Sequence, residues 1–337
     1  MKKLKIVSWN IAHLDRLAKE SLNQVETTRR DAVVREIQAL APDILCLIEG
    51  PKGEEGIDKV ATDLLGGEWA AVKAGDGNYA QQGKQWVWFL VRGELASQAS
   101  LLPPKTWDAF TDKSWPVHFW GQFQEEQHSH YRHPQVLVLD WTGLRVEFIG
   151  LHLKSKFVNY GESMWKAGGA KQEEFIHEAL KARVKMTTEA INVRKYIDRK
   201  FEQVENPAIF VMGDLNDGPG REYFEEQFLF MDLISNIQGD IFSASRFLNH
   251  ALFDFPDHLR WTVQFKDFVT PKRKPEILLD HIMFTQGLVN GSLSWKIEEK
   301  AGKVEHEVHD LINATLRGNE KTSDHKPVSL TVTVKEP

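Results

Sequence analysis

Short apolar runs that end in polar residues recur along the chain, and their lengths are typical of β-strands. Several runs are apolar without interruption, which indicates strands buried on both faces of a sheet. The run at 328–334 instead alternates apolar and polar residues, which predicts a half-buried strand. The runs interpreted as strands are 5–9, 44–48, 85–91, 135–140, 144–151, 207–212 and 328–334.

Helical periodicity separates several of these runs. Between 171 and 201 the apolar residues fall within an arc of roughly 140° at 100° per residue, as expected of a helix packed on a sheet. Residues 29–40 and 54–66 are also expected to be helical. The order strand, helix, strand at the start of the chain usually places two strands side by side with a crossover helix. Mixed helices and strands without a break in composition favour one α/β domain over 1–337.

Residues 97–133 depart from this pattern, and we expect them to form an insertion or a long loop. The stretch is irregular and aromatic. Its rings could stack on bases or touch a lipid surface, but we expect them to cover the core or a loop. Its tryptophans are Trp107, Trp115 and Trp120. Three nearby histidines resemble a metal cluster, but their polar surroundings favour a solvated loop: His128, His130 and His133.

Composition and charge restrict the class of protein. The chain has 337 residues, of which 42% are hydrophobic and 27% charged, as in ordinary globular domains. No apolar run approaches the ~18 residues expected of a membrane span. The formal charge is −6, from 42 basic and 48 acidic residues. This charge argues against a protein that coats nucleic acid by charge alone, but not against an enzyme with a local basic groove.

The N-terminus and the cysteine content lead us to expect a cytoplasmic protein. The first predicted strand begins at residue 5 and leaves no room for a signal peptide. The single cysteine, Cys46, lies in an apolar run and is expected to be a core residue rather than a nucleophile. A reducing cytoplasm fits these features best.

Polar residues at the ends of the predicted strands are the most informative feature of the chain. If the strands that begin with such residues run antiparallel to those that end with them, all of these side chains meet at one edge of the structure. We therefore expect them to form one site. The residues that end strands are Asn10, Glu49, His152 and Asp214, and those that begin strands are Asp280, Asp324 and His325.

The residue types in this group are those needed to hydrolyse a phosphate diester. That reaction requires neutralisation of the phosphate charge, a water placed in line, and protonation of the leaving oxygen. Oxygen ligands from Asn10 and Glu49 suit Mg²⁺ or Mn²⁺ rather than zinc. A neutral amide beside a carboxylate leaves the ion enough positive charge to polarise a phosphoryl oxygen.

The remaining polar residues suit proton transfer and phosphate contact. Asp214 can orient or deprotonate the attacking water, and Asn216 can donate a hydrogen bond to a phosphoryl oxygen. His325 can donate to, or take a proton from, the reacting oxygens. A carboxylate partner such as Asp280 would fix the tautomer of His325 and raise its basicity.

These residues also carry a family resemblance that covers residues 5 to 334. In their order along the chain, six motifs resemble those of the endonuclease/exonuclease/phosphatase family, which includes deoxyribonucleases, sphingomyelinases and inositol polyphosphate phosphatases. The resemblance implies a four-layer α/β sandwich with two mixed sheets face to face, helices outside, and a Mg²⁺-dependent phosphoesterase site. The motifs are SWN at 8–10, IE at 48–49, GLHLKS at 150–155, GDLND at 213–217, LDHI at 279–282 and SDHKP at 323–327.

The match of motifs also implies a role for each residue. A histidine at 152 favours the deoxyribonuclease, sphingomyelinase and phosphatase branches, and His281 stands where an aromatic residue is common. The implied roles are metal ligands for Asn10 and Glu49, a second metal-side carboxylate for Asp324, water and phosphate contacts for Asp214 and Asn216, a carboxylate–histidine dyad for Asp280 and His325, and a phosphate ligand or proton donor for His152.

The leading hypothesis is a Mg²⁺- or Mn²⁺-dependent nuclease. Basic residues motivate the choice of nucleic acid: Lys154 and Lys156 beside the histidine motif, and the run 272–274. Lys154 is a candidate for binding substrate, as is Arg132, which precedes a strand at a recurring family position. An alternative is a phosphatase or phosphodiesterase acting on a small molecule or lipid head group, which the acidic net charge supports. A third is a non-catalytic binding module.

Overall fold

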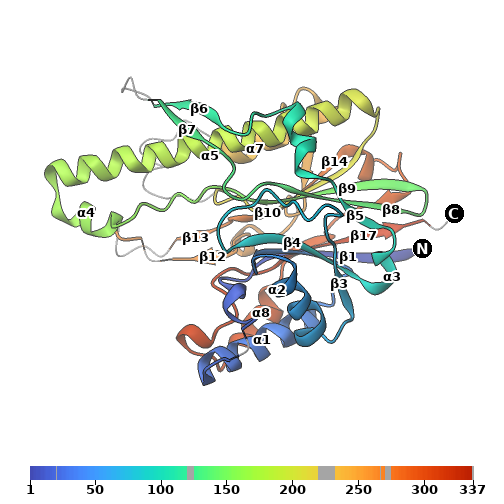
Figure 1. Cartoon of the computed structure of the whole chain (residues 1–337). Helices are drawn as coiled ribbons and strands as arrows, with labels where there is room; N and C mark the ends of the chain where they lie inside the picture. Colours follow the sequence, from blue (N-terminus) through green and yellow to red (C-terminus); the bar gives the residue numbers. More distant parts are fainter. Residues whose placement is uncertain (20, 120–124, 219–231, 266, 270–274, 336–337) are drawn as a thin grey trace.

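Two β-sheets stacked face to face form the centre of the molecule (Figure 1). The computed structural model describes residues 1–19, 21–119, 125–218, 232–265, 267–269 and 275–335. The first sheet has the order β15 (Trp295–Lys296), β17 (Val328–Val334), β1 (Lys2–Asn10), β2 (Ile44–Gly50), β4 (Trp86–Arg92) and β3 (Trp69–Ala71), with β16 (Gly302–Val304) also paired to β17. The second has the order β11 (Leu248–His250), β14 (Asp280–Thr285), β10 (Ala208–Asp214), β9 (Leu144–His152), β8 (Gln135–Trp141) and β5 (Ala99–Leu101).

Helices cover the outer face of each sheet and complete four layers. On one side lie α1 (Gln24–Leu40), α2 (Glu54–Lys59) and α8 (His306–Asn313), and on the other lie α5 (Gly169–Gln203) and α7 (Leu233–Gln238) (Figure 1). Between the sheets, large apolar side chains from both inner faces form one core. Within it, Phe148 and Phe210 stack with ring centroids 4.8 Å apart. The predicted four-layer α/β sandwich with two mixed sheets is confirmed.

The predicted elements agree with the structure in position, with differences at their ends. The helix expected at 29–40 begins earlier, at Gln24, because Asn23 and Glu26 form a reciprocal capping box. The helix expected at 54–66 is α2 followed by a π-helical turn at Val60–Leu64. Hydrogen bonds of that turn span one more residue than those of an α-helix.

A turn of two residues connects β8 to β9 as a hairpin. Thr142 and Gly143 both have positive φ angles, 52° and 76°. Two central residues with positive φ give the turn whose twist matches that of paired strands. The turn therefore sets the register in which β8 pairs with β9.

The longest helix, α5, reaches beyond the sheets it covers. Its 35 residues correspond to about 52 Å at 1.5 Å per residue. The part near its C-terminus packs on the second sheet through Met186, Val193 and Ile197. The N-terminal part extends past the edge of the sheets, where α4 (Gly161–Ala167) folds back beneath it (Figure 1). None of the helices that the structure describes is both long enough and apolar enough to cross a membrane.

The expectation that 97–133 is irregular was only partly right. Within it, β5 joins the second sheet, and β6 (Trp115–His118) pairs with β7 (Glu125–His128) as a separate hairpin. Trp107 is buried and stacks on Tyr196 of α5 at 4.4 Å, so this ring packs on the core as expected. Trp120 lies outside the described residues. The remaining short elements are α3 (Gly93–Ala96), β12 (Val263–Gln264) and β13 (Glu276–Ile277).

The histidines near this region were expected to be solvated, and that expectation was wrong. His130 is buried, and its imidazole packs against Trp115 with ring centroids 5.2 Å apart. His128 Nε2 lies 2.8 Å from Glu189 Oε1 on α5. Burial lowers the pKa of His130 to about 4, so its imidazole is neutral at pH 7. His128 therefore joins the hairpin to the long helix.

Candidate active site

The predicted site residues meet at one edge of the two sheets. β14 runs antiparallel to β10, and β17 runs antiparallel to β1, as the sequence analysis required. In register, Asp214 at the end of β10 lies opposite Asp280 at the start of β14 and opposite His152 at the end of β9. The second sheet therefore places two carboxylates and an imidazole on three neighbouring strands.

A hydrogen bond from the first sheet joins this group. Asn10 Nδ2, at the end of β1, donates to Asp214 Oδ2 at 2.9 Å, and both residues are buried. Burial raises the pKa of Asp214 to about 7, although the nearby imidazole of His325 opposes that rise. Asp214 is thereby close to the point where it can accept or release a proton at neutral pH.

The chain around Asp214 has little room for substitution. Gly213 has a φ angle of +138°, and a Cβ atom there would lie 1.9 Å from the backbone oxygen of Leu151. Only glycine therefore allows the strand to bring Asp214 against its neighbours. Asn216 is left-handed at φ +53°, its backbone N–H donates to Asp214 Oδ1 at 2.8 Å, and its Nδ2 donates to Leu153 O at 3.0 Å. These bonds fix the short loop after β10.

Asp280 and His325 form a close pair, in which Asp280 is fully buried and His325 is partly buried. Asp280 Oδ2 lies 2.7 Å from His325 Nδ1, and Trp9 Nε1 donates to the backbone oxygen of His325 at 2.9 Å. Burial alone would lower the pKa of His325, but the Asp280 carboxylate outweighs burial and raises it to about 10. His325 is therefore protonated at neutral pH.

His152 differs from His325 in charge. Burial, together with the positive charges of Arg132 and His325, lowers the pKa of His152 well below its usual range. Its Nε2 lies 3.6 Å from Asp214 Oδ2, and its Nδ1 has no hydrogen-bond partner within the described part of the chain. His152 is thus a neutral imidazole at the same edge.

Glu49 occupies an unusual backbone position at the end of β2. Its φ angle is +61°, and the register of β2 against β4 shifts between Leu47 and Gly50. Strained positions of this kind concentrate at functional sites. The Glu49 carboxylate accepts a hydrogen bond from the backbone N–H of His13 at 2.8 Å. The bulge therefore directs the carboxylate toward the loop after β1 rather than along the strand.

Gln85 belongs to the site although the sequence analysis did not select it. Gln85 Nε2 donates to Glu49, and its Oε1 accepts from Arg132 Nη2 at 2.9 Å. Burial lowers the pKa of the Arg132 guanidinium, while Glu49 and Asp214 oppose that effect. Arg132 thus lies near both carboxylates, at the same edge of the sheets. Gln85 directly precedes β4. It is therefore a polar residue at the end of a strand, the same pattern that predicted the other site residues.

Arg29 of α1 was also missed, and it connects two loops of the site. Its guanidinium donates to the backbone oxygens of Ala12 and Thr322. These loops follow Asn10 and precede Asp324. No local pattern marks Arg29, because its partners come from the two ends of the sequence.

Two of the remaining predicted residues face different cavities. Asp324 is exposed and lines a cavity of about 920 Å³ together with Asn216 and His325. Lys154 is half-buried and lines a separate cavity of about 640 Å³. The structure therefore does not place Lys154 beside His325. The run 272–274 lies outside the described residues.

A pair of buried histidines supports the loop that carries Asn216. His281 Nε2 donates to Asp217 O at 2.7 Å, and His250 Nε2 lies 2.9 Å from His281 Nδ1. His250 Nδ1 accepts from the backbone N–H of Leu252 at 3.0 Å. Because that nitrogen is an acceptor, the proton of His250 is on Nε2, and the three hydrogen bonds form one ordered chain.

The site has a set of donors suited to a divalent cation. Asn10 Oδ1 and Asp280 Oδ1 are buried and have no hydrogen-bond partner among the described residues. Ligand atoms of Asp214, Asp280 and His325 all lie within 4.8 Å of one another. Oxygen-rich sites of this kind fit Mg²⁺ or Mn²⁺, and buried polar atoms without partners are where an ion is expected. Asp324, expected to be a metal-side carboxylate, lies outside that three-residue group.

The layered sandwich and the polar residues at its edge define the fold of the endonuclease/exonuclease/phosphatase family, as the resemblance in sequence implied. Among solved structures, the chain is similar to truncated TDP2 of Caenorhabditis elegans, with 17% identity, a TM-score of 0.52, and 98% of both chains covered. It is also similar to D. rerio TDP2 complexed with a single-strand DNA product, with 15% identity, a TM-score of 0.51, and 99% and 100% of the two chains covered.

A bacterial structure shares the fold over the same length. The endonuclease/exonuclease/phosphatase from Bacteroides vulgatus is 12% identical, with a TM-score of 0.51 and with 99% of this chain and 100% of that chain covered. No protein-family model matches the sequence, and no curated protein matches it. At these identities the similarity establishes the fold, and function has to be argued from the site.

Proposed function

We propose that the protein is a metal-dependent phosphodiesterase that cleaves nucleic acid by in-line attack of an activated water. The observation that carries the proposal is the placement of Asp214 between the Asp280–His325 pair and His152. Asp214 has a pKa of about 7, so it can act as the base at neutral pH. His325 has a pKa of about 10, so it is protonated and can act as the acid. The proposal also agrees with the fold, which the chain shares with a solved structure described as an endonuclease/exonuclease/phosphatase.

We assign the metal to the ends of β1 and β2. Asn10 and Glu49 would hold Mg²⁺ or Mn²⁺, with Asp324 as a further carboxylate at the mouth of the site. The bound cation would neutralise charge on the phosphate that the protein alone leaves unbalanced. Asn10 Oδ1 supports this assignment, because it is buried and has no hydrogen-bond partner among the residues that the structure describes.

The chain's own residues supply the remaining steps. Asp214 accepts a proton from the attacking water, and Asn10 orients Asp214 through the 2.9 Å hydrogen bond between them. His325, held protonated by Asp280, donates to the reacting oxygens. Asn216, Arg132 and His152 contact phosphoryl oxygens; for Asn216 and Arg132, hydrogen bonds to Leu153 and Gln85 fix the side-chain orientations.

A second candidate function is hydrolysis of a phosphate ester on a small molecule or lipid head group. The cavity beside His325 supports it, because apolar residues such as Phe265 and Phe268 form part of its lining. Nucleic acid remains the better candidate, since Lys156 and Arg183 line the same cavity. A cytoplasmic location completes the proposal, supported by the buried thiol of Cys46.

The test compares substrate classes with the full chain. Nicking of supercoiled plasmid is measured with Mg²⁺ and with Mn²⁺, beside hydrolysis of a small chromogenic phosphodiester and a panel of phosphomonoesters. Nicking that is lost in His325→Ala and Glu49→Gln, but kept in the exposed-glutamate control Glu299→Gln, is the expected result. Turnover of monoesters without nicking would instead select the second candidate. No turnover of any ester would favour a non-catalytic binding module.

A further inference from the structure

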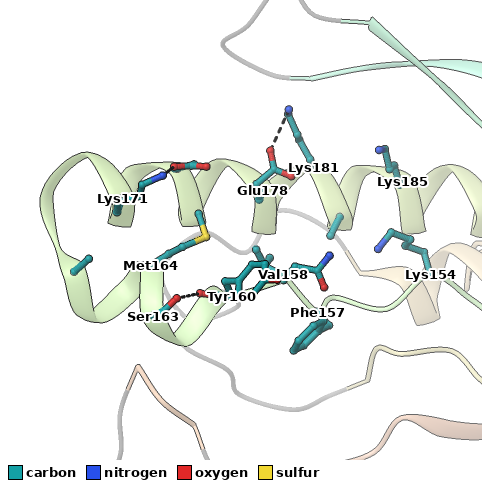
Figure 2. A pocket seen from close by; sticks show the side chains of 14 residues that line it. Lys154, Phe157, Val158, Tyr160, Ser163, Met164, Lys171, Glu178, Lys181 and Lys185 are labelled. Carbon is teal, nitrogen blue, oxygen red and sulfur yellow. Dashed lines mark hydrogen bonds and ion pairs between the residues drawn. The ribbon is translucent and has the colours of Figure 1, made fainter.

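The segment Ser155–Tyr160 separates two cavities near the candidate active site. The larger, about 920 Å³, extends from His325 and Asn216 to Phe157 and Tyr160. The smaller, about 640 Å³, lies between this segment and the N-terminal part of α5, and the same two rings line it (Figure 2). Both volumes are of the size that encloses a ligand group. Phe157 and Tyr160 therefore contribute to the lining of both cavities.

The two aromatic rings on this segment are unusually exposed. Phe157 is 72% exposed and Tyr160 is 83% exposed. Ring faces left in water on a segment between two cavities are available to stack on another planar group. Tyr160 is held in place by its left-handed backbone, φ +61°, at the start of α4.

Lysine side chains surround the rings on the side of the smaller cavity. Lys154, Lys181 and Lys185 line it, and their side chains are drawn above and beside the segment (Figure 2). Lys181 and Lys185 share the carboxylate of Glu126, whereas no described carboxylate forms an ion pair with Lys154. Lys154 Nζ donates to Ser155 O at 3.1 Å, which leaves two of its protons for an anion.

We propose that the segment Ser155–Tyr160 and the two cavities bind an unpaired nucleic-acid strand that continues from the active site. Bases stack on Phe157 and Tyr160, and Lys154 binds a backbone phosphate in the smaller cavity. This inference rests on the proposed function, because it assigns the substrate of the same site. Exposed aromatic rings beside lysines are typical of sites that bind single strands, because bases stack on the rings and the ammonium groups bind the backbone phosphates.

The geometry favours an unpaired strand over the other candidate ligands. In a duplex both faces of each base are covered by neighbouring bases, so protruding rings find no free face to stack on. A lipid surface requires one continuous apolar face, whereas lysines and glutamates such as Lys171 and Glu174 line the smaller cavity here. We therefore expect each of the two rings to stack on a base of an unpaired strand.

Binding is measured by fluorescence anisotropy with a labelled oligothymidylate in EDTA, so that no hydrolysis occurs. Phe157→Ala and Tyr160→Ala are each expected to weaken binding roughly ten-fold. The matched control is Phe242→Ala, since Phe242 is 95% exposed and lines neither cavity. A DNA hairpin of equal charge is expected to bind more weakly than the strand. Equal strand affinity in the double variant Phe157→Ala/Tyr160→Ala and in the control would overturn the proposal.

The lysine contact is tested by salt dependence. Lys154→Met is expected to reduce the slope of log affinity against log salt concentration by about 0.7, the value for one phosphate contact on a single strand. The control is Lys195→Met, because Lys195 is an exposed residue of α5 that lines neither cavity. An unchanged slope in Lys154→Met would show that Lys154 does not bind a backbone phosphate and would contradict this part of the proposal.

The outcome is separable from that of the proposed function. Ring-dependent strand binding without hydrolysis of any phosphodiester supports this inference and contradicts the catalytic proposal. Hydrolysis of the small chromogenic diester without ring-dependent strand binding supports the catalytic proposal and contradicts this inference. Ring-dependent binding to phosphatidylglycerol vesicles, combined with ring-independent strand binding, would assign the segment to a membrane and overturn the inference.

Discussion

Replacing Asp280 with asparagine tests the pair at the centre of the proposed mechanism. The Asp280 carboxylate is fully buried, and its Oδ2 lies 2.7 Å from His325 Nδ1. Asparagine keeps the volume of the side chain and removes its charge. The substitution therefore leaves His325 in its partly buried position without the carboxylate that raises its pKa.

The size of the effect follows from the pKa of His325. Its rise from 6.5 to about 10 corresponds to about 5 kcal/mol in favour of the charged imidazole. In Asp280→Asn, burial becomes the main influence, and the pKa of His325 is expected to fall below 6.5. At pH 8 the imidazole would then be neutral. The rate of phosphodiester hydrolysis should fall about 100-fold or more, because a positioned proton donor is lost.

Two measurements follow the charge of His325 directly. NMR of histidine-labelled protein gives its titration in the wild type and in Asp280→Asn. Stability gives a second readout, because a raised folded pKa stabilises the protein fully below 6.5 and the stabilisation is lost as pH rises toward 10. Between these values the metal-free wild type should lose stability more steeply than the variant, measured by chemical denaturation.

The control and the refuting results are equally specific. Asp112→Asn, at an exposed aspartate outside the site, should leave the rate and the titration unchanged. A His325 that still titrates near pH 10 in Asp280→Asn would refute the assigned cause of its charge. An unchanged hydrolysis rate alongside a lowered pKa would show that the imidazolium is not the proton donor.

Three further predictions concern the metal, the loop and acid stability. Glu49→Gln should abolish the rise in melting temperature that Mg²⁺ produces in the wild type, and a retained rise would exclude Glu49 as a ligand. His281→Phe removes the donor that holds Asp217 O at 2.7 Å, so kcat should fall about ten-fold or more; the unfolding midpoint should fall as well, because the buried Nε2–H of His250 loses its acceptor. An unaltered kcat would exclude this positioning role. Because the pKa of His130 is about 4, stability should decline as pH falls from 6.5 toward 4, by up to about 3 kcal/mol. Denaturation at pH 5 and 7 should show a smaller decline in His130→Leu.

Much of the site could be predicted from the sequence because it is built on strand ends. A strand end can be located from a short apolar run, and antiparallel pairing then brings residues as distant as Asn10 and His325 to one edge. Gln85 follows the same rule and could have been predicted. Arg29 could not, because its acceptors are backbone oxygens that only the completed fold brings near it.

The region 97–133 shows where sequence patterns carry less information. Its strands are three or four residues long, too short for alternation to be distinguished from chance. The contact of His128 with Glu189 of the long helix α5 joins segments some sixty residues apart. The same holds for Lys154, whose motif lies beside His152 while its side chain enters another cavity.

The pairing of β1 with β17 has a consequence for biosynthesis. β1 pairs on one side with β2, which follows it closely in the chain, and on the other side with β17, so one edge of β1 stays unpaired until residues 328–334 have been made. The acid of the proposed pair, His325, lies just before that last strand. A chain that ends before these residues would therefore lack the proposed acid, and the unpaired edge of β1 would be open to aggregation or to quality control.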